Sequence, residues 1–532
     1  MIARLDIISS ISISKKMNIN LFRAKRIIPV TVLILVMGLA LQGIYYFLPN
    51  ISGHKKNKVG NALCNPLDTS NLKVFNEFTW PTEFYPTFGD FNFDGIFEFA
   101  GLIQTKSGDF KYSPARDMGG FIHGRKIPYL VDLNNDGQNE LLITEKNGIY
   151  NSYVYLYEYE SQKERFTLNR SFFDKRLQCH SEQVLFFDYN NDSLTDILIT
   201  CYTHKPNTSF YFMKNLGGLK FENIKSVSRH MNFIEKKFRV EGAQVADINR
   251  DGYLDFYAAS KLMLNAADGT FNSASKTYGI RRVFDEGVLI NDIDLNGSLE
   301  LLRYIPKKGV FSANLAPNSN PEDFSSLKLG GHKPYTGLLY GDFNKDGKVD
   351  FVLGSDNGSV TFSMHLSKEN SSDYECFVSK PIFESHEKKV IVVPTSTGDV
   401  DGDGSLDFSL RVLQYSKAII EDWEVVNVLF KTKIQSAGST YRVRVVDQDG
   451  NMNLFGRQLD FFDKLSGERV ASRIIDGGSG YLSLNAYDLL IHTPRPVDLI
   501  MKYLEQTFEL EENRRNVITL KNLVPIQQSQ SN

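Results

Sequence analysis

The chain has 532 residues and a formal net charge of −3 at pH 7, with 42% hydrophobic, 23% charged and 12% aromatic residues. The near-neutral charge gives no basis for nucleic-acid binding, and the composition excludes a disordered chain. Abundant Phe and Tyr, with only 17 prolines, favour strands over helices.

An uncharged apolar segment at 27–48 is long enough to span a bilayer. Basic residues flank both of its ends and are more numerous before it, so the positive-inside rule places 1–26 in the cytoplasm and the remaining chain outside it. The alternative is a secreted protein whose signal peptide is cleaved near Gly38 and Ala40. We expect a single-pass membrane anchor, because the apolar run continues well past Ala40.

The four cysteines, Cys64, Cys179, Cys201 and Cys376, do not have the spacing of a zinc site. Cys179 and Cys201 flank one hairpin-like segment. This pair is compatible with a disulfide and equally with two free thiols.

A nine-residue acidic motif, such as DFNKDGKVD, occurs seven times at intervals of 42 to 59 residues. The copies, numbered loops 1–7 below, begin at Asp90, Asp132, Asp188, Asp247, Asp292, Asp342 and Asp399. Repeats of this period indicate a solenoid, a propeller or an array. Short apolar runs precede and follow the copies, and helical periodicity is missing between them, so each copy is predicted to join two strands. The pattern predicts an all-β fold with a seven-bladed β-propeller at 75–430, preceded by a linker at 49–74.

The motif places oxygen-bearing side chains at positions 1, 3, 5 and 9, and in most copies a Gly at position 6. An EF-hand would require a Glu at position 12 between two helices, and no copy has a carboxylate there. Ca²⁺ prefers six to eight oxygen ligands, whereas Mg²⁺ demands stricter octahedral geometry with fewer protein ligands. We therefore predict up to seven structural calcium sites, each of which rigidifies a hairpin. The predicted ligands are Asp90, Asn92, Asp94, Glu98, Asp132, Asn134, Asp136, Glu140, Asp188, Asn190, Asp192, Asp196, Asp247, Asn249, Asp251, Asp255, Asp292, Asp294, Asn296, Glu300, Asp342, Asn344, Asp346, Asp350, Asp399, Asp401, Asp403 and Asp407.

The seven loops are not expected to bind equally. Loop 7 has acids at all four positions, and loops 4 and 6 match the pattern well. Loops 3 and 5 are expected to be the weakest, because Ser193 replaces the Gly of loop 3 and Asn296 replaces the acid at position 5 of loop 5. For any single loop, the alternative is an Asp- and Asn-rich turn without an ion.

The repeated DxNxDGxxD motif resembles the FG-GAP (VCBS) repeats of integrin α-subunit propellers and related surface proteins. The resemblance covers about 340 residues and depends on the metal loops, since of the "FG" and "GAP" words only a remnant at Phe88 is left. It implies a seven-bladed propeller with calcium in the loops of one face and partner binding on the opposite face.

After the last motif, alternating and apolar runs predict a small sandwich-like β domain at 431–522, called the C-terminal module below, followed by a polar tail at 523–532. Its stretch from Gly456 to His492 is similar to the ASPIC/UnbV module of cartilage-acidic-protein-like chains, and GGSGYLS at Gly477–Ser483 carries the signature. The family's HFGLG-like continuation is replaced here by LLIHTP.

Catalytic patterns are weak, because the nine histidines are scattered and no HExxH, GxSxG, P-loop or dinucleotide fingerprint occurs. We therefore predict no catalytic residue and no cofactor other than Ca²⁺. The expected function is a membrane-anchored scaffold that binds a protein or a glycan, as in cell adhesion. The alternatives are a propeller hydrolase or lyase that acts on an extracellular polymer, and an assembly factor of an envelope complex.

Overall fold

The structure is a computed structural model that divides the chain into two compact units, Met1–Gly60 and Asn61–Asn532. The described residues all belong to the second unit and are 64–67, 72–78, 88–89, 98–99, 102–104, 110–112 and, with gaps, 125–523. The gaps are 147–150, 161–164, 170–171, 173–175, 203–209, 225–241, 259, 307, 321–324, 328, 330–334, 356–358, 369–372, 383–388, 416–422, 435, 477–487 and 522. The predicted anchor, most of loop 1, the GGSGYLS signature and the tail after 523 therefore lie outside the described residues.

The regular secondary structure of the described residues consists of β-strands, which confirms an all-β fold in this part of the chain. No helix in these ranges is long and apolar enough to cross a membrane. The predicted transmembrane helix at 27–48 lies outside these residues.

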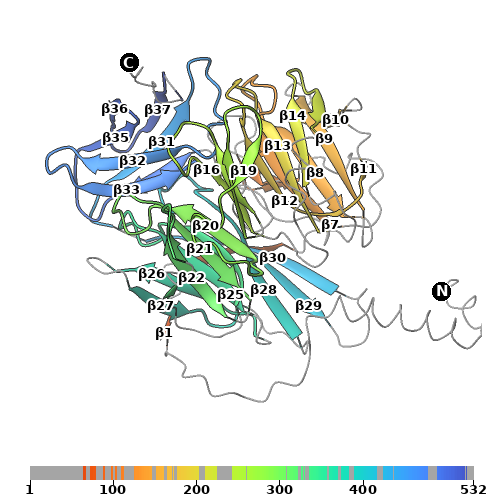
Figure 1. The fold of residues 1–532 in the computed structure, drawn as a ribbon. Coiled ribbons are helices and arrows are strands. Elements are labelled where there is room, and N and C mark those ends of the chain that lie inside the picture. The colour runs from red at the N-terminus through yellow and green to blue at the C-terminus, as the bar shows by residue number, and fades with distance from the viewer. Residues whose placement is uncertain are drawn as a thin grey trace, which may run out of the picture. The chain divides into compact units, whose positions relative to one another are not determined.

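In the described residues, seven sheets follow one another along the chain, and the strands that follow one another in a sheet pair antiparallel, except that β10 and β11 both pair with β9. Figure 1 shows the labelled strands of these sheets. Sheet 1 contains β3 (Phe88–Gly89), β4 (Glu98–Phe99), β5 (Leu102–Gln104) and β6 (Phe110–Tyr112). Sheet 2 contains β7 (Arg125–Val131), β8 (Glu140–Lys146), β9 (Ser152–Glu160), β10 (Arg165–Leu168) and, beside β9, β11 (Arg176–Leu177). Sheet 3 contains β12 (His180–Phe187), β13 (Asp196–Tyr202), β14 (Phe210–Asn215) and β15 (Phe221–Asn223). Sheet 4 contains β16 (Ala243–Ala246), β17 (Asp255–Ala258), β18 (Lys261–Asn265) and β19 (Phe271–Ser273).

The next three sheets repeat the plan. Sheet 5 contains β20 (Gly287–Asn291), β21 (Glu300–Ile305), β22 (Gly309–Asn314) and β23 (Ser325–Ser326). Sheet 6 contains β24 (Tyr335–Gly341), β25 (Asp350–Ser355), β26 (Phe362–Ser367) and β27 (Tyr374–Val378), with β1 (Asn65–Pro66) parallel to β27. Sheet 7 contains β28 (Lys389–Gly398), β29 (Asp407–Tyr415), β30 (Trp423–Thr432) and, beside β30, β2 (Leu72–Phe78).

Neighbouring sheets pack against each other through apolar clusters. Phe187 and Leu198 of sheet 3 share a cluster with Val245 and Phe256 of sheet 4, and similar clusters join sheets 4 and 5, 5 and 6, and 6 and 7. Strands such as β20 are buried along their whole length because both of their faces are covered. The first strands contact one another from β12 through β16, β20 and β24 to β28, and β28 in turn contacts β3 of sheet 1. This order is compatible with a β-propeller.

Strands from the N-terminal side complete the last two sheets. β2 pairs with β30, so that Leu72 lies opposite Thr432, and β1 pairs with β27. The disulfide Cys64–Cys376 fixes β1 at this position, and Cys179–Cys201 bridges the start of β12 to β13. The segment at 49–74, which the sequence predicts as a linker, thus contributes to two sheets. All four cysteines are paired, so Cys179 and Cys201 form a disulfide and are not free thiols.

The C-terminal module consists of two further sheets. Sheet 8 has the order β34 (Leu489–His492), β31 (Thr440–Val446) and β37 (Arg515–Thr519), and sheet 9 the order β33 (Arg469–Ile474), β32 (Gln458–Asp463), β35 (Leu499–Tyr503) and β36 (Gln506–Glu509). Val443, Phe461 and Met501 are fully buried in one cluster that continues into sheets 2 and 3 through Phe186. The module is therefore packed directly onto the repeat region.

His365 of β26 gives sheet 6 a predictable response to acid. Its side chain is fully buried, its Nε2 lies 2.9 Å from the Ser363 hydroxyl, and burial lowers its pKa to about 3. The unfolded chain binds a proton at this residue below pH ~6.5, so stability is lost as pH falls from there toward 3. Between pH 7 and pH 5 this residue alone should lower the folding equilibrium constant roughly 20-fold.

Urea unfolding of the wild type and of His365→Gln at both pH values tests this expectation. The variant should lose less stability on acidification than the wild type, by that factor. An equal acid response in the two proteins would contradict the assignment of the effect to His365.

Candidate metal-binding loops

Each described acidic loop joins the first and second strands of its sheet, as the sequence predicts. Loops 2–7 follow β7, β12, β16, β20, β24 and β28, and their position-9 acids begin β8, β13, β17, β21, β25 and β29. Of the predicted ligands of loop 1, Asp90, Asn92 and Asp94 lie outside the described residues and Glu98 begins β4.

The backbone conformation explains the Gly at position 6. In the described loops this position has a positive φ, for example +87° at Gly347, which glycine adopts without steric cost. Ser193 takes the same conformation in loop 3 with φ +66°, so the departure from the pattern does not change the turn but strains it.

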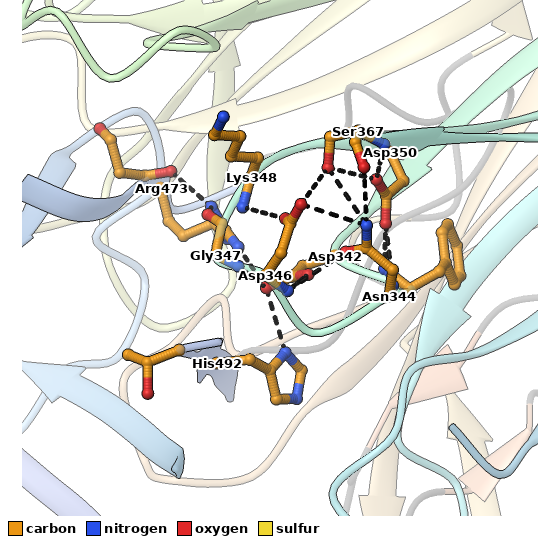
Figure 2. A network of polar contacts seen from close by, with 12 residues as sticks. Asp342, Asn344, Asp346, Gly347, Lys348, Asp350, Ser367, Arg473 and His492 are labelled. Carbon is orange, nitrogen blue, oxygen red and sulfur yellow. Dashed lines mark hydrogen bonds and ion pairs between the residues drawn. The ribbon is translucent and has the colours of Figure 1, made fainter. Parts of the chain in front are cut away.

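Side chains at positions 1, 3 and 5 fold inward onto the loop backbone, as Figure 2 shows for loop 6. Asp342 accepts hydrogen bonds from the backbone N–H groups of Asp346 (3.0 Å) and Gly347 (2.9 Å). The Asn344 amide donates to Asp346 Oδ2 (3.1 Å), and Asp346 Oδ1 accepts the N–H of Lys348 (2.9 Å). Several oxygen atoms are thereby gathered within one turn of chain.

The acid at position 9 connects the loop to the third strand of its sheet. In loop 6, Asp350 is fully buried; its Oδ2 accepts the N–H of Phe343 (2.7 Å), and its Oδ1 accepts the N–H of Ser367 at the end of β26 (2.7 Å). Asp196, Asp255 and Asp407 make the same pair of contacts in loops 3, 4 and 7. The sequence predicts this acid only as a metal ligand, but in the structure it also accepts backbone hydrogen bonds that hold the loop to the sheet.

Burial of these acids carries an electrostatic cost. Removal from water is the main cause that raises the pKa to about 8 for Glu140, Asp196, Asp255, Glu300 and Asp407, and well above its usual range for Asp350. Neighbouring carboxylates raise it further, whereas the backbone N–H donors favour the ionised form. A cation beside these groups would allow them to ionise while buried.

Loops 5 and 7 come closest to a metal site. Within the described ranges, two groups bring one oxygen atom from each of three acids within 4.8 Å of one another: Asp292, Asp294 and Glu300, and Asp399, Asp401 and Asp403. Loop 7 was expected to be the best site, but loop 5 was expected to be among the weakest. Asp294 at position 3 accounts for the difference, because it supplies a carboxylate where loops 2, 3, 4 and 6 have Asn.

Unpartnered buried oxygens support the same two loops. Asp292 Oδ1, Glu300 Oε1 and Asp399 Oδ1 are buried and have no hydrogen-bond partner. A buried polar atom without a partner costs about 1–3 kcal/mol, so these oxygens favour a ligand that supplies positive charge. The residues of loops 5 and 7 therefore fit a hard divalent cation such as Ca²⁺.

Consecutive loops are joined to one another by side chains at position 4. The Asn135 amide donates to the carbonyl of Ser193 (2.8 Å), the Asn191 amide to that of Gly252 (3.4 Å), and Arg250 to that of Gly297. In each case position 4 of one loop contacts position 6 of the next. Loops 2 to 5 therefore form a continuous row along one edge of their sheets.

The C-terminal module contacts the same row with basic side chains. Arg442 binds Asp399 of loop 7, Arg469 binds Asp292 of loop 5 (2.5 Å), and Arg473 binds Asp342 of loop 6 (3.3 Å). His492 lies between Asp342 Oδ2 (3.2 Å) and the Gly404 carbonyl (2.9 Å), and Arg457 donates to Gly252 and Asn191 of loops 4 and 3. Asn453 donates to the carbonyl of Asp132 in loop 2.

Sequence reasoning missed these basic residues. The one local signal is the presence of two basic residues, Arg469 and Arg473, in the short strand β33. Nothing in the sequence pattern relates them to loops more than a hundred residues earlier.

A cavity of about 720 Å³, including space open to solvent, lies between the first strands of sheets 4–7 and the C-terminal module. Gln244, Asn291 and Tyr340 line it from the sheets, and Arg473 and Asp488 from the module. Asp488 is paired with Arg444 and Arg515.

No family model matches the sequence, and no curated protein shows significant similarity to it. Among solved structures, the biofilm matrix protein Bap1 of V. cholerae is 12% identical with a TM-score of 0.28, over 84% of this chain and 85% of that one. BBS1N in complex with ARL6DN is 10% identical with a TM-score of 0.31, over 59% and 94%. The catalytic domain of a Coprinopsis cinerea GH62 α-L-arabinofuranosidase is 10% identical with a TM-score of 0.24, over 66% and 98%. TM-scores this low do not establish a shared fold, so the fold of this chain is described from its own sheets alone.

Proposed function

We propose that this protein is a calcium-stabilised, seven-bladed β-propeller that serves as an extracytoplasmic binding scaffold. The observation that carries the proposal is the common construction of loops 2–7, which gather buried acids at the same turn of six consecutive sheets. One loop of this kind is an ordinary turn, but six in equivalent positions support a shared ligand. Loop 1 supplies the seventh motif.

Calcium is the cation that the donor set favours. The side chains offer carboxylate and amide oxygens without sulfur or imidazole ligands, which suits a hard cation. The crowded acids also need a positive charge to remain ionised while buried. Bound ions would hold each first hairpin in place, which is a structural role.

The location outside the cytoplasm rests on the disulfides Cys64–Cys376 and Cys179–Cys201, since disulfides persist in oxidising compartments. We propose that 27–48 anchors the chain in a membrane with 1–26 in the cytoplasm, and a secreted form remains the alternative. The proposed partner is a protein or a glycan. The loop acids support a scaffold rather than an enzyme, because they contact their own backbone instead of converging on a substrate site.

Removal of calcium should lower the melting temperature of the full-length chain in mild detergent. An ion at 100 times its dissociation constant contributes about 2.7 kcal/mol, so two filled sites would contribute roughly 5 kcal/mol. Differential scanning fluorimetry before and after EDTA, with Ca²⁺ and Mg²⁺ added back separately, measures the effect. Recovery with Ca²⁺ alone is expected. An unchanged melting temperature in EDTA would sink the calcium proposal.

Binding and catalysis are separated by a second measurement. The chain should bind a subset of a glycan or protein array in Ca²⁺ and leave soluble polysaccharides intact on prolonged incubation. Release of shorter products from any polymer would overturn the scaffold in favour of the enzyme.

A further inference from the structure

In loop 5, one carboxylate oxygen of Asp292 has no hydrogen-bond partner, while the other is bound by an arginine of the C-terminal module. Asp292 Oδ2 accepts hydrogen bonds from Gly297 N–H (2.9 Å) and from Arg469 Nη1 (2.5 Å). Asp292 Oδ1 is buried and has no partner, and it lies beside Asp294 and Glu300. The arginine and an ion can therefore bind different oxygens of the same carboxylate.

The seventh loop repeats this arrangement with a different strand of the module. Asp399 Oδ2 accepts Gly404 N–H (3.1 Å) and an N–H of Arg442, which lies on β31. Asp399 Oδ1 is again buried without a partner, beside Asp401 and Asp403. In both loops, the arginine binds one oxygen of the first acid and leaves the other oxygen without a partner.

The charges of the two loops match one divalent ion plus these basic side chains. The three carboxylates of loop 5 keep one negative charge after a divalent ion is bound, and Arg469 neutralises it. The four carboxylates of loop 7 keep two, which Arg442 and Lys431 neutralise, since Lys431 lies 3.2 Å from Asp401. Either cation alone leaves uncompensated negative charge in the buried part of the loop, whereas the two together compensate it.

Contacts within the C-terminal module hold Arg469 in position. It packs over the ring of Phe462 (5.2 Å) and lies 3.5 Å from Asp460, both on the neighbouring strand β32. A Cβ at Gly297 would lie only 3.2 Å from Arg469 Nη1, so the guanidinium contacts the loop backbone closely. Groups that hydrogen-bond to a ligand carboxylate and orient it in this way commonly change metal affinity about 10–100-fold.

We propose that Arg442 and Arg469 complete the cation sites of loops 7 and 5 by binding the outer oxygen of the first acid in each loop, so that ion binding and docking of the C-terminal module stabilise each other. This inference rests on the proposed function for the presence of the ion. The module then acts as a cap that calcium holds on the loop face, and calcium loss loosens it. By reciprocity, loosening the module weakens calcium binding by the same factor.

Calcium titration of the full-length chain by isothermal calorimetry tests the proposal. Arg442→Gln and Arg469→Gln should each weaken one class of site about tenfold. Arg469→Lys keeps the charge and should recover most of the affinity. Arg514→Gln is the matched control, because Arg514 belongs to the module but pairs with Glu511 on its surface, and it should change nothing. Hydrogen exchange of β31 and β33 should be slower in Ca²⁺ than in EDTA for the wild type.

The possible results separate this inference from the proposed function. Equal calcium affinity in the wild type and both Gln variants would overturn the inference and leave the calcium scaffold intact. Tighter binding in the Gln variants would also overturn it, because it would mean that arginine competes with the ion. No calcium binding by the wild type would overturn both. The circular dichroism spectrum of Arg469→Lys in EDTA should match that of the wild type. This control shows that the calcium affinities of two folded proteins are being compared.

Discussion

Replacement of Gly347 with alanine is expected to destabilise the protein far more than the same change at Gly137. Both residues occupy position 6 of an acidic loop and have nearly the same backbone conformation, with φ +87° and +86°. A Cβ at Gly347 would lie 2.2 Å from the Val470 carbonyl oxygen of the C-terminal module, whereas a Cβ at Gly137 would meet nothing within 4 Å. The strained backbone costs about 1–2 kcal/mol in both variants.

The additional cost at Gly347 is the displacement of the module. A contact of 2.2 Å with a backbone atom cannot be relieved by rotation of a side chain, so β33 must move and the contacts of Arg473 and His492 with Asp342 are weakened. We expect Gly347→Ala to lose at least ~3 kcal/mol more than Gly137→Ala in urea unfolding, and to speed hydrogen exchange in β33. Similar losses in the two variants would contradict the close packing of the module on loop 6.

The second large effect is expected at Asp350. Its carboxylate accepts the N–H groups of Phe343 and Ser367, both of which are buried. Asp350→Ala leaves these donors without a partner, at about 1–3 kcal/mol each, so the variant should lose roughly 3–5 kcal/mol. The measurement is made in EDTA, so that loss of an ion does not contribute.

Asp346→Ala is the matched control in the same loop. Asp346 accepts the N–H of Lys348 and the hydroxyl of Ser367 (2.7 Å), but it is only half-buried, so water can replace it. In EDTA this variant should lose about 1 kcal/mol. In Ca²⁺ it should lose more, because position 5 is a predicted ligand. If Asp350→Ala were as stable as Asp346→Ala in EDTA, position 9 would have no structural role beyond metal binding.

These two pairs of variants separate three roles within one nine-residue motif. Position 6 permits the turn and, in loop 6, close approach of the module. Position 9 ties the loop to the third strand, and positions 1, 3 and 5 gather oxygens for a cation. In loops 5, 6 and 7 the first acid also binds an arginine of the C-terminal module, so the motif is both a candidate metal site and a docking site.

The sequence by itself determined the repeating unit. Asp132 and Glu140, like the corresponding pairs of loops 3–7, stand between apolar runs that form adjacent antiparallel strands, because this pairing depends on residues a few positions apart. The same local reasoning predicted the β-rich C-terminal module, whose strands include β31, β32 and β35. It ranked loop 5 low because Asn296 replaces the acid at position 5, although Asp294 supplies a carboxylate at position 3; the structure brings oxygens of Asp292, Asp294 and Glu300 within 4.8 Å of one another.

Only the tertiary structure decided which distant segments meet. β2 pairs with β30, Cys64 bonds to Cys376 at a separation of 312 residues, and Arg469 of the C-terminal module contacts Asp292 of loop 5. Hydrophobic periodicity and turn residues specify how a segment folds but do not identify the partner that covers it, since apolar burial is non-directional. The module's place on the loop face is fixed instead by shape and by charge, where buried carboxylates of the loops must find basic partners.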